Sequence, residues 1–295
     1  MNSLNFMQKG CPQMKKLSCR LVLSVLLGIA FVASVVCAEA PGERFPLSKG
    51  ELYIPSHFTA PEGNTFDMVF HMHGSLQTAE ENLYKSGVNA VLIAFDLQRA
   101  SSVYRNYFSD QTKFGAVLQE ALAKLKEKYP DKTPEIGYLC MTAFSAGYAG
   151  IREILKDQKY YDQIDAIFLA DALHTNYVKG KHVDPDQMKD FMKFALDAAE
   201  GKKRFIMSHS RVEPGNYAST TECADYLTSG VGALCEQMSQ KNELGMELES
   251  KCEKGKFVIY GFKGDAAKDH MSHFYSMYLF LKEADFRQSA AKKDQ

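Results

Sequence analysis

The sequence lacks a surplus of basic residues, internal repeats and low-complexity tracts, and these absences narrow its class. Its 35 lysines and arginines are balanced by 36 aspartates and glutamates, whereas nucleic-acid-binding proteins normally carry a basic patch. No two of its seven cysteines stand at C-x-x-C spacing, which is typical of structural zinc sites. We therefore expect no nucleic-acid partner and no cysteine-based zinc site.

Long apolar runs are also scarce, and the clear exception lies near the N-terminus. A basic segment that ends at Arg20 precedes an apolar stretch, residues 21–36, and small residues up to Ala38. That order is typical of a secretory signal peptide. We predict that residues 1–38 are a signal peptide and that the protein is exported, to the periplasm or outside the cell. Retention of this segment as a membrane anchor stays open.

The remaining residues, 39–295, are predicted to form a single domain. They carry 31 basic against 36 acidic residues, a net charge of about −5 with neutral histidines. A chain of this length can bury a full core. After cleavage of the signal peptide we expect no stable insertion into a membrane, and the sequence does not decide the oligomeric state.

Four cysteines belong to this predicted domain. Cys140 lies in an apolar run and is predicted to be a buried thiol. Cys223, Cys235 and Cys252 fall in a polar segment, where an oxidising compartment permits one disulfide. The sequence leaves its pairing open.

Short apolar runs alternate with segments of helical periodicity. The predicted strands are Thr65–His71, Val88–Phe95, Glu135–Met141, Ile164–Ala170, Arg204–Ser208 and Lys256–Gly261, with Leu52–Ile54 as a candidate edge strand. The predicted helices are Phe114–Tyr129, Asp186–Ala199, Cys223–Leu227 and Met271–Ala284. This alternation predicts an α/β fold, a three-layer α/β/α sandwich around a mostly parallel sheet.

Polar residues gather where the predicted strands end. Five of the eight histidines lie at or just after strand ends: His71, His73, His174, His209 and His270. Ligands of open α/β sheets bind outside the carboxyl ends of the strands. The sequence therefore predicts a polar site along one edge of the sheet.

The stretch Ala143-Phe144-Ser145-Ala146-Gly147 joins a predicted strand to an amphipathic helix without room for a loop. A sharp strand-to-helix turn can expose a serine hydroxyl for nucleophilic attack, and small neighbours let that turn pack tightly. The alternative is that Ser145 only caps a core helix.

Three motifs make the sequence similar to the α/β-hydrolase fold superfamily, and the segments SAGYAGIREIL and YASTTECADYL with the final histidine resemble exported bacterial proteins. They are the strand end HMHGS, the turn FSAGY and the late GDAAKDH, and the resemblance spans roughly Leu52 to Ala284. Ala143 departs from the motif G-x-S-x-G, although alanine commonly substitutes there in the superfamily. The resemblance implies a serine hydrolase of esterase type that works without a cofactor.

The resemblance also implies partners for Ser145. His270 is favoured as the base over His273, because it ends the loop after the last predicted strand. The acid is Asp171, directly at a strand end, or alternatively Glu213, in the loop where the superfamily usually places it. Either choice keeps the chain order serine, acid, histidine.

The same resemblance assigns an oxyanion hole. Its expected donors are the backbone N–H groups of Ser75 (or Leu76) and Ala146, which would stabilise charge on the attacked carbonyl oxygen. His73, Gly74 and Gly147 are expected to support these turns rather than to react.

Two other readings stay open. His71 and His73, with Asp171, His174 or His209, could form a metal-dependent hydrolase site. Alternatively, the fold has lost catalysis and serves as a binding or envelope-associated protein.

The expected substrate is a small or medium acyl ester, with an amide or peptide bond in an envelope component as a second option. Tyr104, Tyr107, Phe108 and Tyr217 are candidates for an aromatic pocket beside the site.

Overall fold

The apolar runs pair into one large sheet in the computed structural model, which describes residues 39–98 and 100–286. Within these residues the strand order is β1-β2-β4-β3-β5-β6-β9-β12-β11-β10. The six strands from β4 to β12 are mutually parallel, and the outer pairs at both edges run antiparallel. The strands are β1 (Gly42–Pro46), β2 (Glu51–Pro55), β3 (Thr65–Met72), β4 (Val91–Phe95), β5 (Glu135–Phe144), β6 (Ala166–Ala170), β9 (Arg204–His209), β10 (Leu234–Lys241), β11 (Glu247–Lys254) and β12 (Phe257–Phe262).

The six strands predicted from continuous apolar runs are the six parallel strands. This agreement follows from burial on both faces, since every residue of β4 and β6 is buried. The run around Leu52–Ile54 forms a strand, β2, as predicted, but it is not the edge strand. Strand β1 pairs outside β2 and forms the edge of the sheet. A short hairpin, β7 (Tyr177–Val178) with β8 (His182–Val183), stands apart from the sheet.

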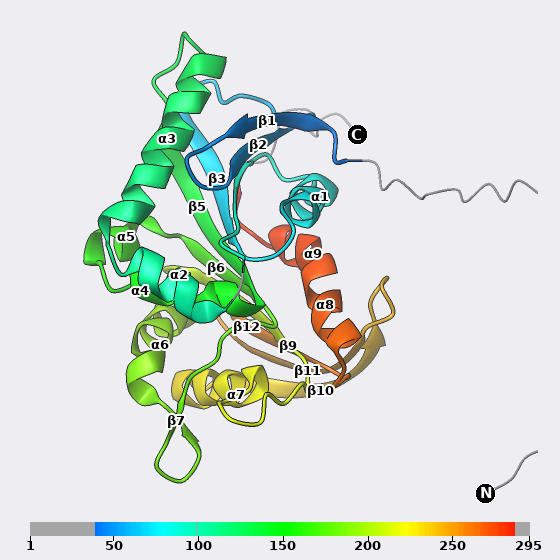
Figure 1. The fold of residues 1–295 in the computed structure, drawn as a ribbon. Coiled ribbons are helices and arrows are strands. Elements are labelled where there is room, and N and C mark those ends of the chain that lie inside the picture. The colour runs from blue at the N-terminus through cyan, green and yellow to red at the C-terminus, as the bar shows by residue number, and fades with distance from the viewer. Residues whose placement is uncertain (1–38, 99, 287–295) are drawn as a thin grey trace, which may run out of the picture. The chain divides into compact units, whose positions relative to one another are not determined.

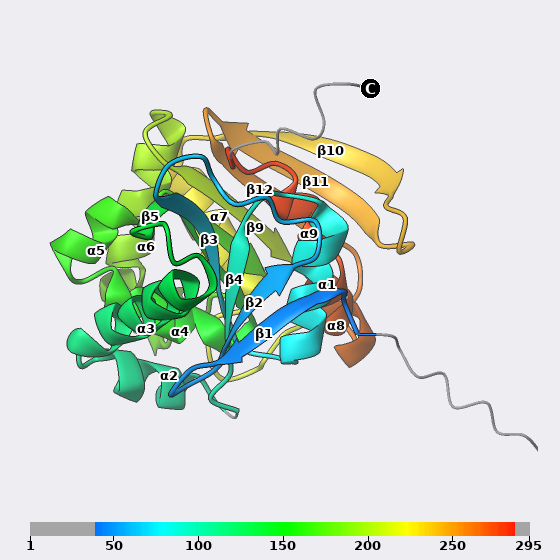
Figure 2. The same cartoon turned by 90° about the horizontal axis from the view of Figure 1, so that it is seen from above.

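Helices cover both faces of the sheet, as Figures 1 and 2 show. On one face lie α2 (Ser101–Phe108), α3 (Thr112–Lys128), α4 (Tyr148–Ile154), α5 (Gln158–Gln163), α6 (Pro185–Ala199) and α7 (Thr220–Val231). On the other lie α1 (Leu76–Ser86), α8 (Ala267–Tyr275) and α9 (Met277–Leu281). The predicted three-layer α/β sandwich is confirmed.

Strand β3 shows how the two cores are separated. Phe66, Met68, Phe70 and Met72 belong to the core under α2–α7, whereas Val69 belongs to the core under α1, α8 and α9. Successive side chains of a strand point to opposite faces, so one strand supplies both cores.

The predicted long helix Met271–Ala284 is two helices. Ser276 separates α8 from α9 with a non-helical φ of −100° and ψ of 2°. Asn82 of α1 fills the break: its side-chain amide donates to the carbonyl of Phe274 (2.8 Å) and accepts from the backbone N–H of Tyr278 (2.9 Å). A long-range partner therefore replaces backbone hydrogen bonds that the sequence pattern alone would continue.

Capping motifs mark the starts of α6 and α7. Asp184 caps α6 and is followed by Pro185 at the first helical position. Ser219 and Glu222 form the capping box of α7.

A disulfide joins Cys235 to Cys252 across the β10–β11 pair. Cys140 and Cys223 are buried thiols. The structure thus supplies the pairing that the sequence left open.

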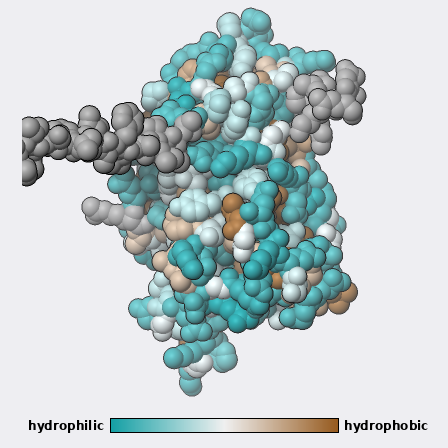
Figure 3. Space-filling view, turned by 90° about the vertical axis from the view of Figure 1, so that its right-hand side faces the viewer, coloured by the Kyte–Doolittle hydropathy of each residue, from teal (hydrophilic) through white to brown (hydrophobic). Residues whose placement is uncertain are grey.

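The face that carries α1, α8 and α9 is mostly hydrophilic, with small apolar spots (Figure 3). No helix within the described ranges is both long and apolar enough to span a bilayer. The predicted signal peptide falls on residues 1–38, which lie outside the described residues.

Candidate active site

Ser145 lies at the turn between β5 and α4. The strand ends at Phe144, and a single turn of 3-10 helix, η1 (Ser145–Gly147), leads directly into α4. Ser145 has a φ of 46°, in the left-handed region that residues other than glycine seldom adopt. This is the sharp strand-to-helix turn that the sequence predicts, and backbone strain of this kind concentrates at functional sites.

Close packing explains the small residues around Ser145. A Cβ atom on Gly147 would lie 2.2 Å from the carbonyl oxygen of Met72 at the end of β3, so a larger residue would displace the turn from the strand. Ala143 is fully buried and packs in the core under α2–α7. Alanine in the first position of the motif therefore contributes a buried methyl group to the core and leaves the turn in place.

His270, in α8, contacts Asp171 at the end of β6. The His270 Nδ1 atom lies 2.7 Å from Oδ2 of Asp171, across 99 residues of sequence. An ionised carboxylate only accepts hydrogen bonds, so Nδ1 carries the proton and Nε2 is left as the basic nitrogen. The Asp171 side chain is 2% exposed and that of His270 is 25% exposed, so the histidine links a buried charge to the surface of the site.

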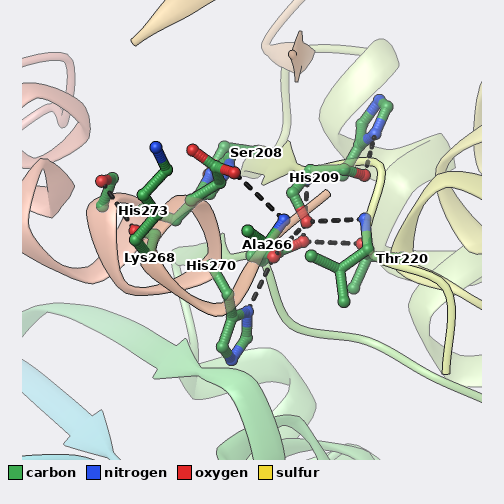
Figure 4. Close-up of polar contacts among 12 residues, drawn as sticks. Ser208, His209, Thr220, Ala266, Lys268, His270 and His273 are labelled. Atoms are coloured by element: carbon green, nitrogen blue, oxygen red, sulfur yellow. Dashed lines mark hydrogen bonds and ion pairs between the residues drawn. The ribbon is translucent and has the colours of Figure 1, made fainter. Parts of the chain in front are cut away.

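Three further hydrogen bonds hold the Asp171 carboxylate. Ser210 donates its backbone N–H to Oδ1 (2.9 Å) and its hydroxyl to Oδ2 (2.6 Å), and the Thr220 hydroxyl donates to Oδ1 (2.6 Å). Figure 4 shows that His270 and Thr220 reach this network from different elements.

The network keeps Asp171 ionised. Burial alone would raise the pKa of the Asp171 carboxyl, but hydrogen bonds from His270, Ser210 and Thr220 and the nearby His273 outweigh it and lower the pKa below its usual range. Asp171 is therefore an anion that can orient His270 and stabilise its protonated form.

The alternative acid, Glu213, lies elsewhere. It is exposed in the loop after β9, and among the described residues no hydrogen bond or ion pair joins it to His270. The structure thus brings Asp171, and not Glu213, to the histidine.

The alternative base, His273, is fully buried one helical turn after His270. Its Nδ1 atom lies 2.7 Å from the Ser208 hydroxyl oxygen, and burial lowers its pKa to about 4. This is a neutral core histidine with a hydroxyl partner.

Phe144 connects the serine side of the site to the histidine. Its ring centroid lies 4.6 Å from that of His270, and Ser145 is the next residue along the chain. Within the described residues the Ser145 hydroxyl makes no hydrogen bond. Serine–histidine hydrogen bonds are often long or poorly aligned in the absence of substrate, so this geometry is compatible with a relay from Ser145 to His270.

His73 and Gly74 make the turn after β3, next to Ser145. Both have positive φ, 76° and 107° respectively. A Cβ atom on Gly74 would lie 2.5 Å from the Phe274 ring, so glycine is required for conformation and for space. The His73 Nδ1 atom lies 3.1 Å from the Tyr104 hydroxyl oxygen, which fits the supporting role expected for His73.

The two predicted oxyanion donors stand at helix starts on neighbouring strands. Ser75 caps α1 after β3, and Ala146 lies in the first turn after β5. The strands are parallel neighbours, with Met72 paired to Ala143. The first N–H groups of a helix have no partner within the helix, so both segments present backbone donors at the same edge of the sheet.

The histidines proposed for a metal site form hydrogen bonds with other groups of the protein. Both ring nitrogens of His71 are hydrogen-bonded, to the Thr142 hydroxyl and to the carbonyl of His73, each at 2.9 Å. His174 and His209 use Nδ1 on Ala218 and Thr221. In the part of the chain that the structure describes, no group of three histidine, cysteine, aspartate or glutamate residues is placed to hold a metal ion.

A cavity of about 330 Å³ opens beside Ser145. Ser145, Ala146, His174, Tyr217 and residues of α2 and α4 form its wall. Of the aromatic residues expected there, Tyr217 lines the cavity, whereas Tyr104 and Phe108 are buried in the core and Tyr107 packs against that core.

The strand order, with six parallel strands between an antiparallel pair at each edge, and the serine at the strand-to-helix turn decide the fold. The chain has the α/β-hydrolase fold. No protein-family model matches the sequence, and the search of curated proteins returns no match.

Several solved structures are similar to this chain. The enterobactin esterase FES from Shigella flexneri, solved in the presence of 2,3-di-hydroxy-N-benzoyl-glycine, is 10% identical with a TM-score of 0.48, over 82% of this chain and 58% of that one. The chain thus spans 58% of the length of that esterase. The siderophore hydrolase EstB from Aspergillus nidulans is 10% identical with a TM-score of 0.45, over 85% of this chain and 98% of that one.

Esterase 2 of Thermogutta terrifontis, phosphonylated by cyclosarin, is 15% identical with a TM-score of 0.44, over 85% of this chain and 97% of that one. The assignment of the fold rests on strand order and on the Ser145 turn rather than on these similarities.

The sequence patterns alone do not point to Ser210, Thr220 or Arg152 of this site. Ser210 and Thr220 lie 39 and 49 residues from the carboxylate they hold. Thr220 follows the capping-box serine of α7, and that motif is the one local signal near these residues. Arg152 lines the cavity from within α4, where the sequence reads as the polar face of a helix.

Proposed function

We propose that this α/β-hydrolase is a serine hydrolase that cleaves a carboxylic ester through an acyl-enzyme. The observation that carries the proposal is the 2.7 Å contact between His270 Nδ1 and the buried Asp171, together with a serine that has a φ of 46° and lines a cavity. Ser145, His270 and Asp171 are the nucleophile, base and acid of this proposal.

The chemistry follows from the position of each group. The Ser145 hydroxyl oxygen attacks the acyl carbonyl while His270 Nε2 takes its proton, and Asp171 stabilises the imidazolium that results. The N–H groups of Ser75 (or Leu76) and Ala146 hold the oxyanion. His270 then protonates the leaving alcohol. Water, activated by the same nitrogen, releases the acid and restores the serine.

A panel of 4-nitrophenyl esters of increasing acyl length, with aminoacyl 4-nitroanilides alongside, tests the proposal. We expect ester hydrolysis that Ser145→Ala lowers at least about 1000-fold, because that change removes the nucleophile. Amide hydrolysis without ester hydrolysis would redirect the proposal to the amide or peptide option. Absence of both activities in folded protein would favour the non-catalytic binding protein.

We also propose export, on the pattern of residues 1–38. Expression in a bacterial host followed by intact-mass analysis tests this: the expected product begins at Glu39 and is released with the periplasmic fraction. A chain that keeps residues 1–38 in the membrane fraction would support the anchor instead.

A further inference from the structure

Arg152 is a buried cation in α4, the helix that follows Ser145. The residue is 9% exposed. Nη1 donates to the side-chain oxygen of Gln187 (3.3 Å) and Nη2 to the carbonyl of His174. Nε has no partner among the described residues. Both acceptors are neutral, and the guanidinium carbon lies 4.9 Å from the centroid of the Tyr148 ring. The protein thus surrounds this charge with dipoles and an aromatic face rather than with an opposite charge.

The nearest carboxylates are committed to other partners. Glu153 forms an ion pair with Lys156 (2.7 Å), and Asp184 caps α6 and accepts from the Gln187 amide (2.7 Å). No ion pair within the described residues includes Arg152. A buried cation without a counter-ion is unfavourable, and burial lowers the pKa of Arg152. Within the described residues, no anionic group compensates for the burial of this charge.

Arg152 lines the cavity that Ser145 also lines, and the rest of the cavity is suited to an anion. Arg105 of α2 is a second cation of its wall, and none of the described lining residues is acidic. Helix α2 begins in the same wall with Ser101 and Ser102, and its cap residue, Ala100, has no side chain that satisfies the first N–H groups. A helix N-terminus carries partial positive charge and attracts anions.

We propose that this cavity binds a carboxylate of the substrate, held by Arg152, so that the substrate is an ester with a carboxylate on its acyl or its alcohol part. The inference rests on the proposed function, because it deepens the same Ser145 site. The planar guanidinium still has unused N–H groups and matches a carboxylate in two-point geometry. Gln187 fixes its orientation, and the small cavity keeps the carboxylate near the scissile bond. Arg152 therefore acts as a specificity residue.

Two matched substrate pairs test the inference. One is 4-nitrophenyl hemiglutarate against its methyl ester, with the charge on the acyl side. The other is 4-acetoxybenzoate against methyl 4-acetoxybenzoate, with the charge on the alcohol side. We expect kcat/KM to favour the charged member of at least one pair by about 10-fold or more, mainly through KM, because the carboxylate pairs with a desolvated cation.

The variants Arg152→Met and Arg152→Lys test whether Arg152 causes the preference for the charged ester. The methionine variant should abolish the preference for the charged ester, and the lysine variant should keep part of it. Lys159→Met removes one exposed positive charge outside the cavity and should leave the preference intact. Thermal melting of each variant identifies any loss of folding.

A second readout does not require turnover. Glutarate should slow labelling of Ser145 by an uncharged fluorophosphonate in the wild-type protein and not in Arg152→Met, whereas glutaramide should slow neither. Labelling without protection by glutarate, together with equal kcat/KM within both pairs, would overturn the carboxylate site and leave the hydrolase proposal standing. Absence of labelling and of all hydrolysis would instead overturn the hydrolase proposal.

Discussion

At the scale of single residues, the site depends on one buried carboxylate. Asp171 has a φ of 42°, an unusual conformation for a non-glycine residue, at the point where β6 ends. Its oxygens accept four hydrogen bonds, from His270, Ser210 twice and Thr220. Charge-assisted hydrogen bonds of this kind contribute roughly 1.5–3 kcal/mol each, which offsets the burial of the charge.

Replacement of Asp171 by asparagine should show whether Asp171 or Glu213 is the acid that orients His270. Asp171→Asn keeps the shape but allows the wrong His270 tautomer, so we expect kcat to fall by about 10³- to 10⁴-fold. The matched change Glu213→Gln, on an exposed residue of the next loop, should change kcat less than about twofold. Ester kinetics of both variants check this, and the reverse ranking would move the acid to Glu213.

Two buried histidines should make stability depend on pH. Burial lowers the pKa of His71 and of His273 to about 4 each. Between about pH 6.5 and 4 the unfolded chain binds protons that the folded chain does not, so the free energy of unfolding falls as pH falls. The slope is at most about 1.4 kcal/mol per pH unit for each histidine. The contribution of Asp171, whose pKa is lowered, is lost only below about pH 4.

Urea denaturation at pH 7, 6 and 5 measures this dependence. His273→Asn removes one of the buried titrating histidines and should reduce the slope, whereas the exposed His182→Asn should leave it unchanged. A slope in the His273 variant equal to that of the wild type would contradict the assignment.

At the scale of elements, the chain was predictable where local pattern and burial agree. The parallel strands are continuous apolar runs, and Asp184 and Ser219 cap α6 and α7 as their motifs predict. The β10–β11 hairpin escaped prediction because most residues of β10 are exposed and carry no apolar signal. The break between α8 and α9 was not predicted, because Asn82, almost 200 residues away, supplies the hydrogen bonds at the break.

The disulfide Cys235–Cys252 should stabilise this exposed hairpin. The two cysteines are 17 residues apart, and closing a loop of that size contributes about 3 kcal/mol in the chain-entropy model. The double variant Cys235→Ser/Cys252→Ser should lower the free energy of unfolding toward that extent. Cys223→Ser, at a buried thiol outside the bridge, is the comparison, since it removes a cysteine without breaking a crosslink.

Alkylation of the denatured chain from residue 39 onward checks the pairing directly. We expect two modified cysteines without reductant, Cys140 and Cys223, and four after reduction. Modification of Cys235 or Cys252 without reductant would show that the bridge does not form in solution.

At the scale of the whole molecule, the three-layer architecture and the edge that carries the site could be predicted, and the interior of the site could not. Ser145, Asp171 and His270 stand at strand ends or loop ends, where the sequence already places reactive groups. The partners of Asp171 and the position of Arg152 depend on contacts between distant segments, which no local pattern encodes. The cavity could not be predicted either, because loops and helices from five separate regions of the chain form its wall.

The central claim is that Ser145 is an activated nucleophile. It is tested most directly by treating the folded protein with a fluorophosphonate probe and mapping the adduct by peptide mass spectrometry. The account predicts one adduct, on Ser145, that forms more slowly in Asp171→Asn and is absent in Ser145→Ala. No adduct on the folded wild-type protein, or an adduct that persists in Ser145→Ala, would contradict it.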